Sequence, residues 1–515
     1  MEILTFQVSD RTPLLQAHRS TMGVKNIGIS QQTLVSNQEF NSKGQRLPQY
    51  IAAIAATLGA LSCGTVLGWS TSAGKNGVDL AQEYGLPISA SEFSWIGSFP
   101  NLGAAASCIP IGILMDIVGR KPGMLMLVAP FTVGWGLVIW ANSAMMFYIG
   151  RFLLGLSGGA FCVAAPLYTA EIAEDEIRGT LGSYFQLFLC LGILFSYTLG
   201  AYSSLFVLSL VSAIFPLLFF AVFFFMPETP VYYLLKNKED QARASLLRLR
   251  GSRYNVEQEL QAKKEALAEE ARNKGSLIQA LKSKVVLKGL LVAFGLMTFQ
   301  QLSGVNAIIF YIGTMFGDTG GLSPEVSTII VGVMQVCAVF VSTLVVDKLG
   351  RKILLISSEV AMTIGAVILG VYYYLDHIEV DVSAISWLPL LSVSLFLIMF
   401  NLGFGPIPWM MVGEIFAPQV KSTAGSSACL YNWLMAFVVT RFYDDLVLAL
   451  GDYTTFWIFG GICMLGIFFV LFIVPETKGK TLEISKIIFY NNVVYHFYNY
   501  LFFFLFLLFY RPLNI

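Results

Sequence analysis

Amide side chains recur inside long apolar stretches of this 515-residue chain. The set that stands out is Gln186, Gln300, Gln301, Asn306, Gln335, Asn401 and Asn432, together with the aromatic Trp409. An amide both donates and accepts hydrogen bonds, and an aromatic face packs on C–H groups, so the set suits a neutral, hydroxylated molecule. Polar residues in membrane helices tend to face the interior or a water-filled cavity. The alternative is that each amide only joins two helices, which is worth about 0.6 kcal/mol on average.

Charged residues form a second pattern, and it occurs twice. The motif Asp-x-x-Gly-Arg-Lys begins at Asp116 and again at Asp347, where its glycine permits a tight turn between two membrane helices. The repeated set is Asp116, Arg120, Glu171, Arg178 and Glu228, matched by Asp347, Arg351, Glu414, Lys421 and Glu476. We expect these groups to clamp one half to the other when the cytoplasmic side is shut. Exposed pairs are worth only about 0–1 kcal/mol each, so such a latch is reversible, and topology signals alone are the alternative.

The elements that position these residues are apolar runs. Hydrophobic residues make up 56% of the chain and charged residues 12%, which excludes an ordinary cytosolic enzyme. A membrane-spanning helix needs about 20 apolar residues, and twelve runs meet that need. They lie near 50–72, 93–115, 122–142, 144–168, 180–202, 204–226, 288–313, 325–346, 353–375, 385–412, 422–447 and 453–474. We therefore predict an all-α integral membrane protein with twelve transmembrane helices in two pseudo-symmetric six-helix bundles.

The repeat and the runs together predict the organisation of the chain. A flexible cytoplasmic tail covers 1–48, the two bundles cover 49–226 and 288–474, an intracellular linker with short helices covers 227–287, and a tail with an atypical apolar segment covers 475–515. Duplicated six-helix halves are typical of transporters with a substrate site between them. Lys and Arg gather in the loops on one side, so we expect a multi-pass protein with its N-terminus in the cytoplasm.

Other classes of protein are disfavoured by the same residues. Thirty-two basic and thirty-two acidic residues leave no net charge to hold nucleic acid. The three histidines and seven cysteines show no metal-ligand spacing, so no metal or cofactor is expected, and the cysteines are interpreted as small core side chains. No candidate nucleophile lies near a histidine, so the chain is not expected to be an enzyme.

Several further motifs resemble those of the sugar porter family of the major facilitator superfamily. They are Arg151-x-x-x-Gly155-x-x-x-Gly159, Pro227-Glu228-Thr229-Pro230, Gln300-Gln301-Leu302-Ser303-Gly304-Val305-Asn306, Gly405-Pro406-Ile407-Pro408-Trp409 and Pro475-Glu476-Thr477-Lys478-Gly479. The resemblance covers about residues 50–484, and the stretch from Gly403 to Glu414 is similar to insect facilitated trehalose and hexose transporters. It implies the major facilitator fold and alternating access to a sugar.

The resemblance also implies roles for individual residues. Gln186, Gln300, Gln301, Asn306, Gln335, Trp409 and Asn432 match positions that contact sugar, and Asn401 stands where some hexose carriers have glutamate. Tyr311 would close over the sugar from outside, with a core aromatic as its alternative. Breaks at Gly304 and at Pro406 and Pro408 interrupt two spans and are expected to move, since such breaks occur where a cavity satisfies the backbone.

The energy source, partners and location follow from what the first span and the tails contain. Proton-coupled relatives carry an acid in the first span, whereas residues 64–72 hold none, so facilitated uniport is favoured; a proton symporter and a non-transporting sugar sensor are the alternatives. The expected partners are the sugar and the lipid bilayer. A sorting adaptor could also bind the acidic dileucine motif at Asp10, Leu14 and Leu15. We expect a monomer in the cell membrane, with an intracellular vesicle membrane as the alternative.

Overall fold

A computed structural model describes residues 44–74, 77–174, 176–272, 284–317, 322–416 and 418–478, and the structural statements below concern this part of the chain. The dileucine at Asp10, Leu14 and Leu15 and the apolar segment of the C-terminal tail lie outside these ranges.

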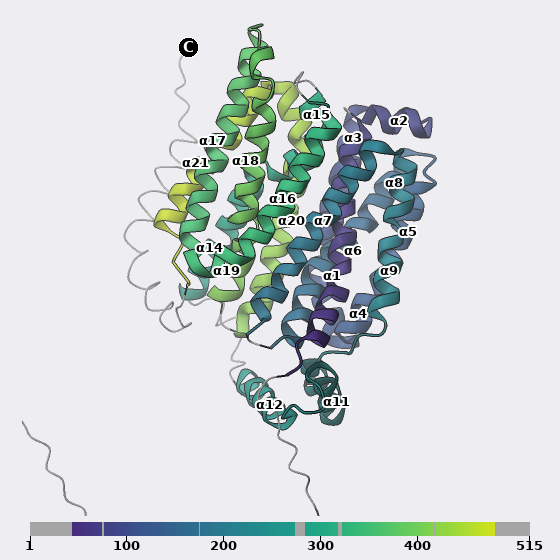
Figure 1. The fold of residues 1–515 in the computed structure, drawn as a ribbon, viewed down its shortest axis with the longest axis vertical. Helices are drawn as coiled ribbons and strands as arrows, with labels where there is room; N and C mark the ends of the chain where they lie inside the picture. The colour runs from purple at the N-terminus through teal and green to yellow at the C-terminus, as the bar shows by residue number, and fades with distance from the viewer. Residues whose placement is uncertain are drawn as a thin grey trace, which may run out of the picture. The chain divides into compact units, whose positions relative to one another are not determined.

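The first half of the described chain folds into short and long helices (Figure 1). They are α1 (Leu47–Gly68), η1 (Trp69–Ala73), α2 (Val78–Tyr84), α3 (Ala90–Val118), α4 (Arg120–Met126), α5 (Val128–Ile139), α6 (Ala144–Ile172), α7 (Arg178–Tyr202), α8 (Leu205–Ser212) and α9 (Ile214–Phe223). Local sequence sets these boundaries. Ser89 and Glu92, for example, form a capping box that starts α3, since each side chain binds the backbone N–H of the other.

The central stretch and the second half continue the same architecture. The central helices are α10 (Pro230–Leu235), α11 (Glu239–Arg250) and α12 (Val256–Arg272). The second half contains α14 (Lys284–Leu302), α15 (Val305–Gly317), α16 (Pro324–Leu349), α17 (Arg351–His377), η3 (Ser383–Ile385), α18 (Leu388–Leu402), α19 (Ile407–Ile415), α20 (Pro418–Leu450) and α21 (Asp452–Phe472).

Eleven stretches of the described residues are long and apolar enough to cross a membrane. The remaining predicted run, 422–447, lies within α20, whose 33 residues extend for about 50 Å at 1.5 Å per residue. The predicted twelve-helix architecture is therefore confirmed. The two predicted breaks are also present: α14 and α15 separate at Ser303 and Gly304, and α18 and α19 separate at 403–406.

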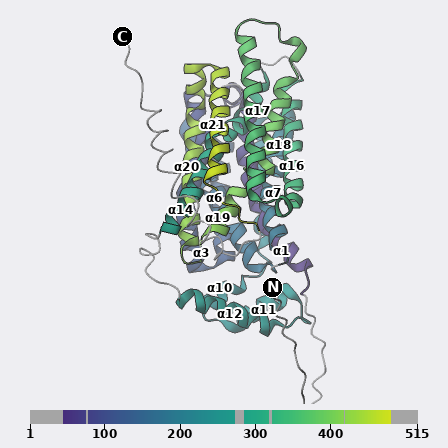
Figure 2. The same cartoon turned by 90° about the vertical axis from the view of Figure 1, so that its left-hand side faces the viewer.

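The two six-helix halves lie side by side, with α10, α11 and α12 beneath one end of the first half (Figures 1 and 2). We call this the charged end; it also holds the two Asp-x-x-Gly-Arg-Lys turns at Gly119 and Gly350. The other end, which holds η1 and α2, is the opposite end. The halves meet mainly where α3 packs on α20 and where α7 packs on α16, and η1 contacts α15 at the opposite end.

Candidate functional site

Four predicted amides gather where the seventh span is interrupted. Gln300 and Gln301 lie in the last turn of α14, Asn306 lies at the start of α15, and Asn432 lies in the middle of α20. The Nδ2 of Asn432 donates to Oε1 of Gln300 at 2.7 Å, and Nε2 of Gln301 donates to Oδ1 of Asn432 at 3.0 Å. Asn306 in turn donates to Gln301. Folding thus joins residues that lie about 130 positions apart into one polar cluster, which we call the amide cluster.

The amide cluster extends to the break in the tenth span. The Nε2 of Gln300 donates to the backbone oxygens of Phe404 at 2.7 Å and Gly405 at 3.0 Å. Pro406 and Pro408 follow directly, and a break of this kind leaves carbonyls that the helix itself does not satisfy. One side chain therefore holds the two interrupted spans together, at the point where both are expected to move.

Hydrogen-bonding capacity distinguishes Gln300 from Gln301. An amide has two N–H donors and two acceptor lone pairs. Gln300 uses both donors and one lone pair, whereas Gln301 uses one donor and one lone pair within the described structure. Gln301 therefore retains one donor and one acceptor, the pair that a hydroxyl group of a ligand can bind.

The other predicted binding residues lie outside the amide cluster. Gln186 of α7 donates to Oδ1 of Asn401 of α18 at 3.4 Å, so this contact joins the two halves. Gln335 of α16 is buried, and its Nε2 has no partner in the described part of the chain. Trp409 of α19 is 38% exposed, so its ring borders open space rather than the core.

Contacts between the halves cross the opposite end. Tyr311 of α15 is buried, stacks on Tyr443 with ring centroids 5.1 Å apart, and meets Phe93 of α3 edge-on at 6.3 Å. Beside it, Thr71 of η1 and Tyr197 of α7 both donate to the backbone oxygen of Ile309, at 3.1 and 2.9 Å. Tyr311 therefore lies in the seam between the halves.

Arg151 occupies the interior of the first half without a carboxylate among its observed partners. It is fully buried in α6, and its guanidinium donates to the backbone oxygens of Val66 and Ile96 and to the hydroxyl of Ser70, at 2.8, 3.2 and 2.7 Å. The same group lies 4.8 Å from the ring centroid of Trp69. Neutral groups of the first and second spans therefore stabilise this charge.

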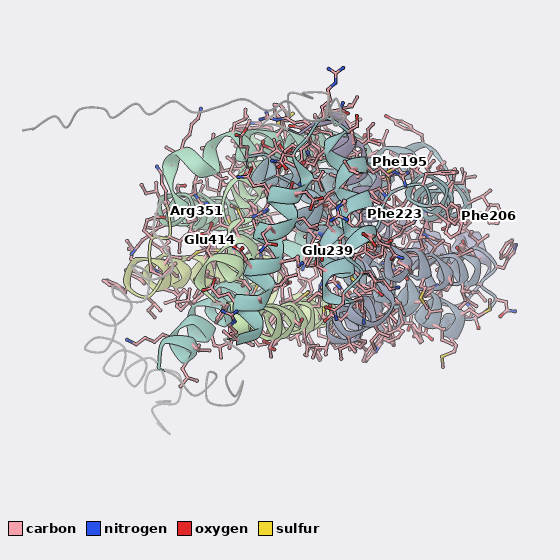
Figure 3. All side chains as sticks on the ribbon, turned by 90° about the horizontal axis from the view of Figure 1, so that it is seen from below. Phe195, Phe206, Phe223, Glu239, Arg351 and Glu414 are labelled. Carbon is pink, nitrogen blue, oxygen red and sulfur yellow. The ribbon has the colours of Figure 1, made fainter. Side chains whose placement is uncertain are left out.

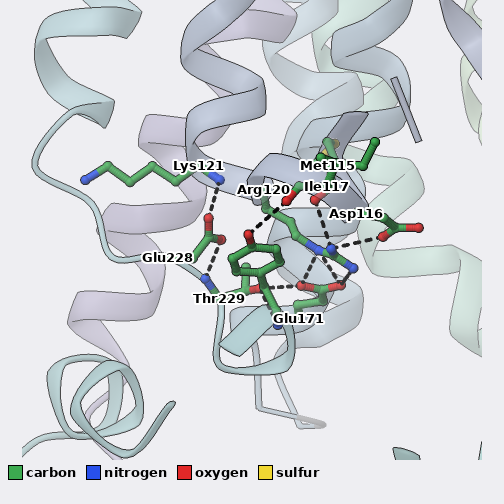
Figure 4. Close-up of polar contacts among 9 residues, drawn as sticks. Met115, Asp116, Ile117, Arg120, Lys121, Glu171, Glu228 and Thr229 are labelled. Atoms are coloured by element: carbon green, nitrogen blue, oxygen red, sulfur yellow. Dashed lines mark hydrogen bonds and ion pairs between the residues drawn. The ribbon is translucent and has the colours of Figure 1, made fainter. Parts of the chain in front are cut away.

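Charged residues of the first half form a compact cluster at the charged end (Figure 4). Nε and Nη2 of Arg120 donate to the Glu171 carboxylate at 2.9–3.1 Å, and Nη1 donates to Asp116 at 3.0 Å. The Thr229 hydroxyl donates to Glu171 as well. Glu228 accepts from the backbone N–H groups of Lys121 at 3.0 Å and Thr229 at 2.7 Å, so it caps the start of α4.

The second half repeats the main bonds of this cluster, the arginine–glutamate pair, the threonine hydroxyl bond and the capping carboxylate. Arg351 donates to Glu414 at 2.9 Å, and the Thr477 hydroxyl donates to the same carboxylate. Glu476 accepts from the backbone N–H groups of Arg351 and Lys352, at 3.1 and 3.0 Å, and so caps α17. Figure 3, viewed from this end, shows Arg351 and Glu414 beside one another. Each of these bonds joins residues of the same half, and none of them links the two halves.

The glycine of each motif makes room for the capping carboxylate. Gly119 has φ +113° and Gly350 has φ +91°, a region that disfavours residues with a side chain. A Cβ at Gly119 would lie 2.4 Å from Oε2 of Glu228, and one at Gly350 would lie 2.9 Å from Oε2 of Glu476. The repeated glycine therefore permits both the turn and the cap.

The two capping carboxylates have opposite pKa shifts. Burial raises the pKa of Glu228 above its ordinary value, although backbone N–H groups and Arg120 oppose the shift. Burial acts on Glu476 too, but this residue is less buried, and backbone N–H groups, Lys478 first among them, outweigh burial and lower its pKa. Acidification therefore neutralises the first cap before the second.

The predicted latch has three further members, Arg178, Asp347 and Lys421. Arg178 is the exposed first residue of α7. The side chains of Asp347 and Lys421 lie outside the described part of the structure.

Sequence reasoning overlooked three polar residues that the structure places inside the bundle or at its charged end. Asn101 of α3 donates to the Thr440 hydroxyl of α20 at 2.9 Å, across the two halves. Glu359 of α17 is fully buried, and both its carboxylate oxygens are without partners in the described residues. Arg250 is buried, pairs with Glu259 at 2.9 Å and so binds α11 to α12. Asn101 and Glu359 could have been found by the signal used for the amides, a polar residue within an apolar run.

A twelve-helix membrane bundle with two matched halves and a buried amide cluster defines a membrane carrier of the major facilitator type, and comparison with known proteins agrees. The family model described as "Sugar (and other) transporter" matches residues 37–489. The chain belongs to this family. It is similar to the facilitated trehalose transporter Tret1 of Polypedilum vanderplanki, with 40% identity over 438 residues that cover 84% of this chain and 86% of that protein.

Further relatives and solved structures agree with this assignment. The facilitated trehalose transporter Tret1 of Bombyx mori is 37% identical over 84% of this chain and 85% of that protein, whereas the match covers 54% of the protein of the same name in Aedes aegypti. The proton:xylose symporter XylE bound to 6-bromo-6-deoxy-D-glucose aligns with a TM-score of 0.71 and 25% identity, over 86% of this chain and 99% of that one. The partially occluded inward open conformation of XylE from E. coli also has a TM-score of 0.71, at 23% identity over 84% of this chain and 99% of that one.

Proposed function

We propose that this chain carries a neutral sugar, trehalose or a hexose, across a membrane by facilitated diffusion. The observation that supports this most directly is the amide cluster, which is buried between two interrupted spans and leaves hydrogen-bonding capacity on Gln301. An uncharged, hydroxylated ligand suits amides, and the names of the trehalose-transporting relatives point to the same class of substrate. Gln186, Gln335, Asn401 and Trp409 complete the proposed site.

Uniport is favoured over proton coupling by the surroundings of Arg151. Its observed partners in the first span are a carbonyl and the Ser70 hydroxyl, neither of which exchanges a proton near neutral pH. The structurally similar XylE is named a proton symporter, so proton coupling is the second candidate. A sugar sensor on the same fold would bind sugar without carrying it.

The charged clusters then act as the two sides of a gate. In the structure Arg120 pairs with Glu171 and Arg351 pairs with Glu414, each within its own half, and Tyr311 lies at the opposite end. We propose that the clusters meet across the halves, through Arg178, Lys421 and the Asp116 and Asp347 ends of the motifs, when the charged end closes. The charged end would face the cytoplasm, because Lys and Arg concentrate there.

The remaining assignments concern location and partners. We propose a multi-pass monomer of the cell membrane with its N-terminus inside, and a sorting adaptor for the dileucine at Asp10, Leu14 and Leu15. Surface labelling of intact cells, with an epitope at either terminus, tests this arrangement; labelling of the N-terminal epitope without permeabilisation would contradict it.

Uptake into liposomes tests the function itself. The purified protein is reconstituted, and entry of labelled trehalose and glucose is followed under a sugar gradient without an ion gradient. We expect saturable entry that stops at equal concentrations inside and outside. Accumulation driven by a proton gradient would support the symporter, and binding without entry would support the sensor. A Gln301→Ala variant and protein-free liposomes serve as controls.

A further inference from the structure

Two cysteines from different halves lie in contact inside the bundle. The Sγ of Cys108, on α3, is 3.1 Å from the Sγ of Cys429, on α20, and both residues are buried. A second pair, Cys63 on α1 and Cys162 on α6, interacts nearby but lies wholly within the first half. Of these two pairs, only Cys108 and Cys429 join the halves.

The pair belongs to the seam along which the halves must separate. From the opposite end inward, Ser94 donates to the backbone oxygen of Arg441 at 2.7 Å, Asn101 donates to Thr440 at 2.9 Å, and the two thiols follow. The seam is therefore closed along much of α3 in this conformation. If the chain works by alternating access, as proposed above, α3 and α20 must move apart in each transport cycle.

We propose that Cys108 and Cys429 form a redox-sensitive switch. Oxidation by a peroxide joins them in a disulfide that links the two halves. One thiol attacks hydrogen peroxide to give a sulfenic acid and one water; the second thiol then attacks that sulfur, the S–S bond forms, and a second water leaves. Two thiols are oxidised, and the two peroxide oxygens are reduced to two waters. The sulfurs have to approach by about 1 Å to reach the bond length of about 2.05 Å.

Burial sets the rate of this reaction. Both sulfurs are buried, so the reagent cannot reach them while the seam is shut. The first oxidation therefore needs a seam that has opened, and the second step needs a seam that has closed again. A protein that cycles should form the bond faster than one held in a single conformation.

Two features separate this proposal from simple packing of small side chains. The contact crosses a moving boundary, whereas Cys63 and Cys162 lie on helices of one half. The described residues also contain no group of three metal-ligand side chains, so a metal does not account for the gathered thiols. A disulfide here would join α3 to α20, prevent their separation and so stop transport, and reduction would restore it.

A cleavable full-length chain tests the bond directly. A protease site is inserted between Arg272 and Lys284, and the protein in liposomes is treated with hydrogen peroxide, blocked with N-ethylmaleimide, cut, and run on a gel without reductant. The halves should remain linked and separate on addition of dithiothreitol. Cys108→Ala and Cys429→Ser should each abolish the link. Cys63→Ala is the matched control and should keep it.

Uptake is measured on the same samples. We expect peroxide to reduce uptake to the level of empty liposomes, dithiothreitol to restore it, and Cys429→Ser to resist the loss. Halves that separate in the oxidised wild type, or a link that survives in both variants, would overturn the proposed pair. A link that forms while uptake continues would refute the claim that the disulfide stops transport. Absence of uptake in the reduced protein would refute the proposed transport function. The gel would still show whether Cys108 and Cys429 form a disulfide.

Discussion

Truncation of the two neighbouring glutamines should separate sugar binding from structural support. Gln301 keeps one donor and one acceptor that no described residue uses, whereas Gln300 keeps a single lone pair. We therefore expect Gln301→Ala to cost more sugar affinity than Gln300→Ala, and Gln300→Ala to cost more stability than Gln301→Ala.

The magnitudes follow from the bonds that each variant loses. A neutral hydrogen bond is worth about 0.5–1.5 kcal/mol, so loss of two sugar contacts at Gln301 weakens affinity by about 5- to 150-fold, and loss of one at Gln300 by about 2- to 12-fold. Gln300→Ala also leaves the carbonyls of Phe404 and Gly405 unsatisfied, at about 1–3 kcal/mol each. The partners of Gln301 are side chains, which can turn toward water or one another.

Two measurements decide between the variants. Sugar affinity is obtained from the concentration dependence of counterflow in liposomes, and stability from the thermal unfolding midpoint in detergent. Gln261→Ala is the matched control, since Gln261 is an exposed amide on α12 and should change neither quantity.

The reverse order would refute the reasoning. If Gln300→Ala reduced affinity more strongly while its unfolding midpoint stayed that of the wild type, the bonds to Phe404 and Gly405 would not support the break. If neither variant changed affinity, the amide cluster would be interhelical packing and the sugar would bind elsewhere.

Three further predictions concern the charged caps, the closed end and the buried arginine. Glu228→Gln should become more stable relative to the wild type as pH rises above about 4.3, the ordinary glutamate pKa, because the raised pKa of Glu228 stabilises the fold only while the carboxyl is protonated. Glu476→Gln should show the opposite slope below about pH 4.3, because the lowered pKa of Glu476 gives stability that is lost on acidification. Tyr311→Ala should slow uptake more than Tyr311→Phe, which keeps the ring contacts and loses one hydrogen bond of about 0.5–1.5 kcal/mol. Ser70→Asp should make uptake depend on pH, because it places a titratable carboxylate against Arg151.

Each of these predictions has a result that contradicts it. Parallel slopes of the unfolding midpoint against pH for the two cap variants would show that burial does not distinguish the caps. Equal rates for the two Tyr311 variants would assign its role to the hydroxyl instead of the ring. Uptake by Ser70→Asp that stays independent of pH would show that its carboxylate does not exchange protons during the cycle.

Properties that depend on short stretches of chain were predictable from the sequence. Hydropathy over about 20 residues located the spans, and Gly304 and Pro406 marked the two interruptions. The repeated motifs predicted matched halves, and the structure shows the match down to the caps provided by Glu228 and Glu476.

Which residues touch was decided by tertiary structure alone. The sequence placed Gln300 and Asn432 in separate spans, and only packing of α14 against α20 brings their amides together. Packing of α3 on α20 likewise brings Cys108 to Cys429, although nothing in either apolar run distinguishes these thiols from the other core cysteines. The physical reason is that hydropathy and turn preferences are local, whereas a contact between distant residues depends on how each helix is rotated and seated against its neighbours.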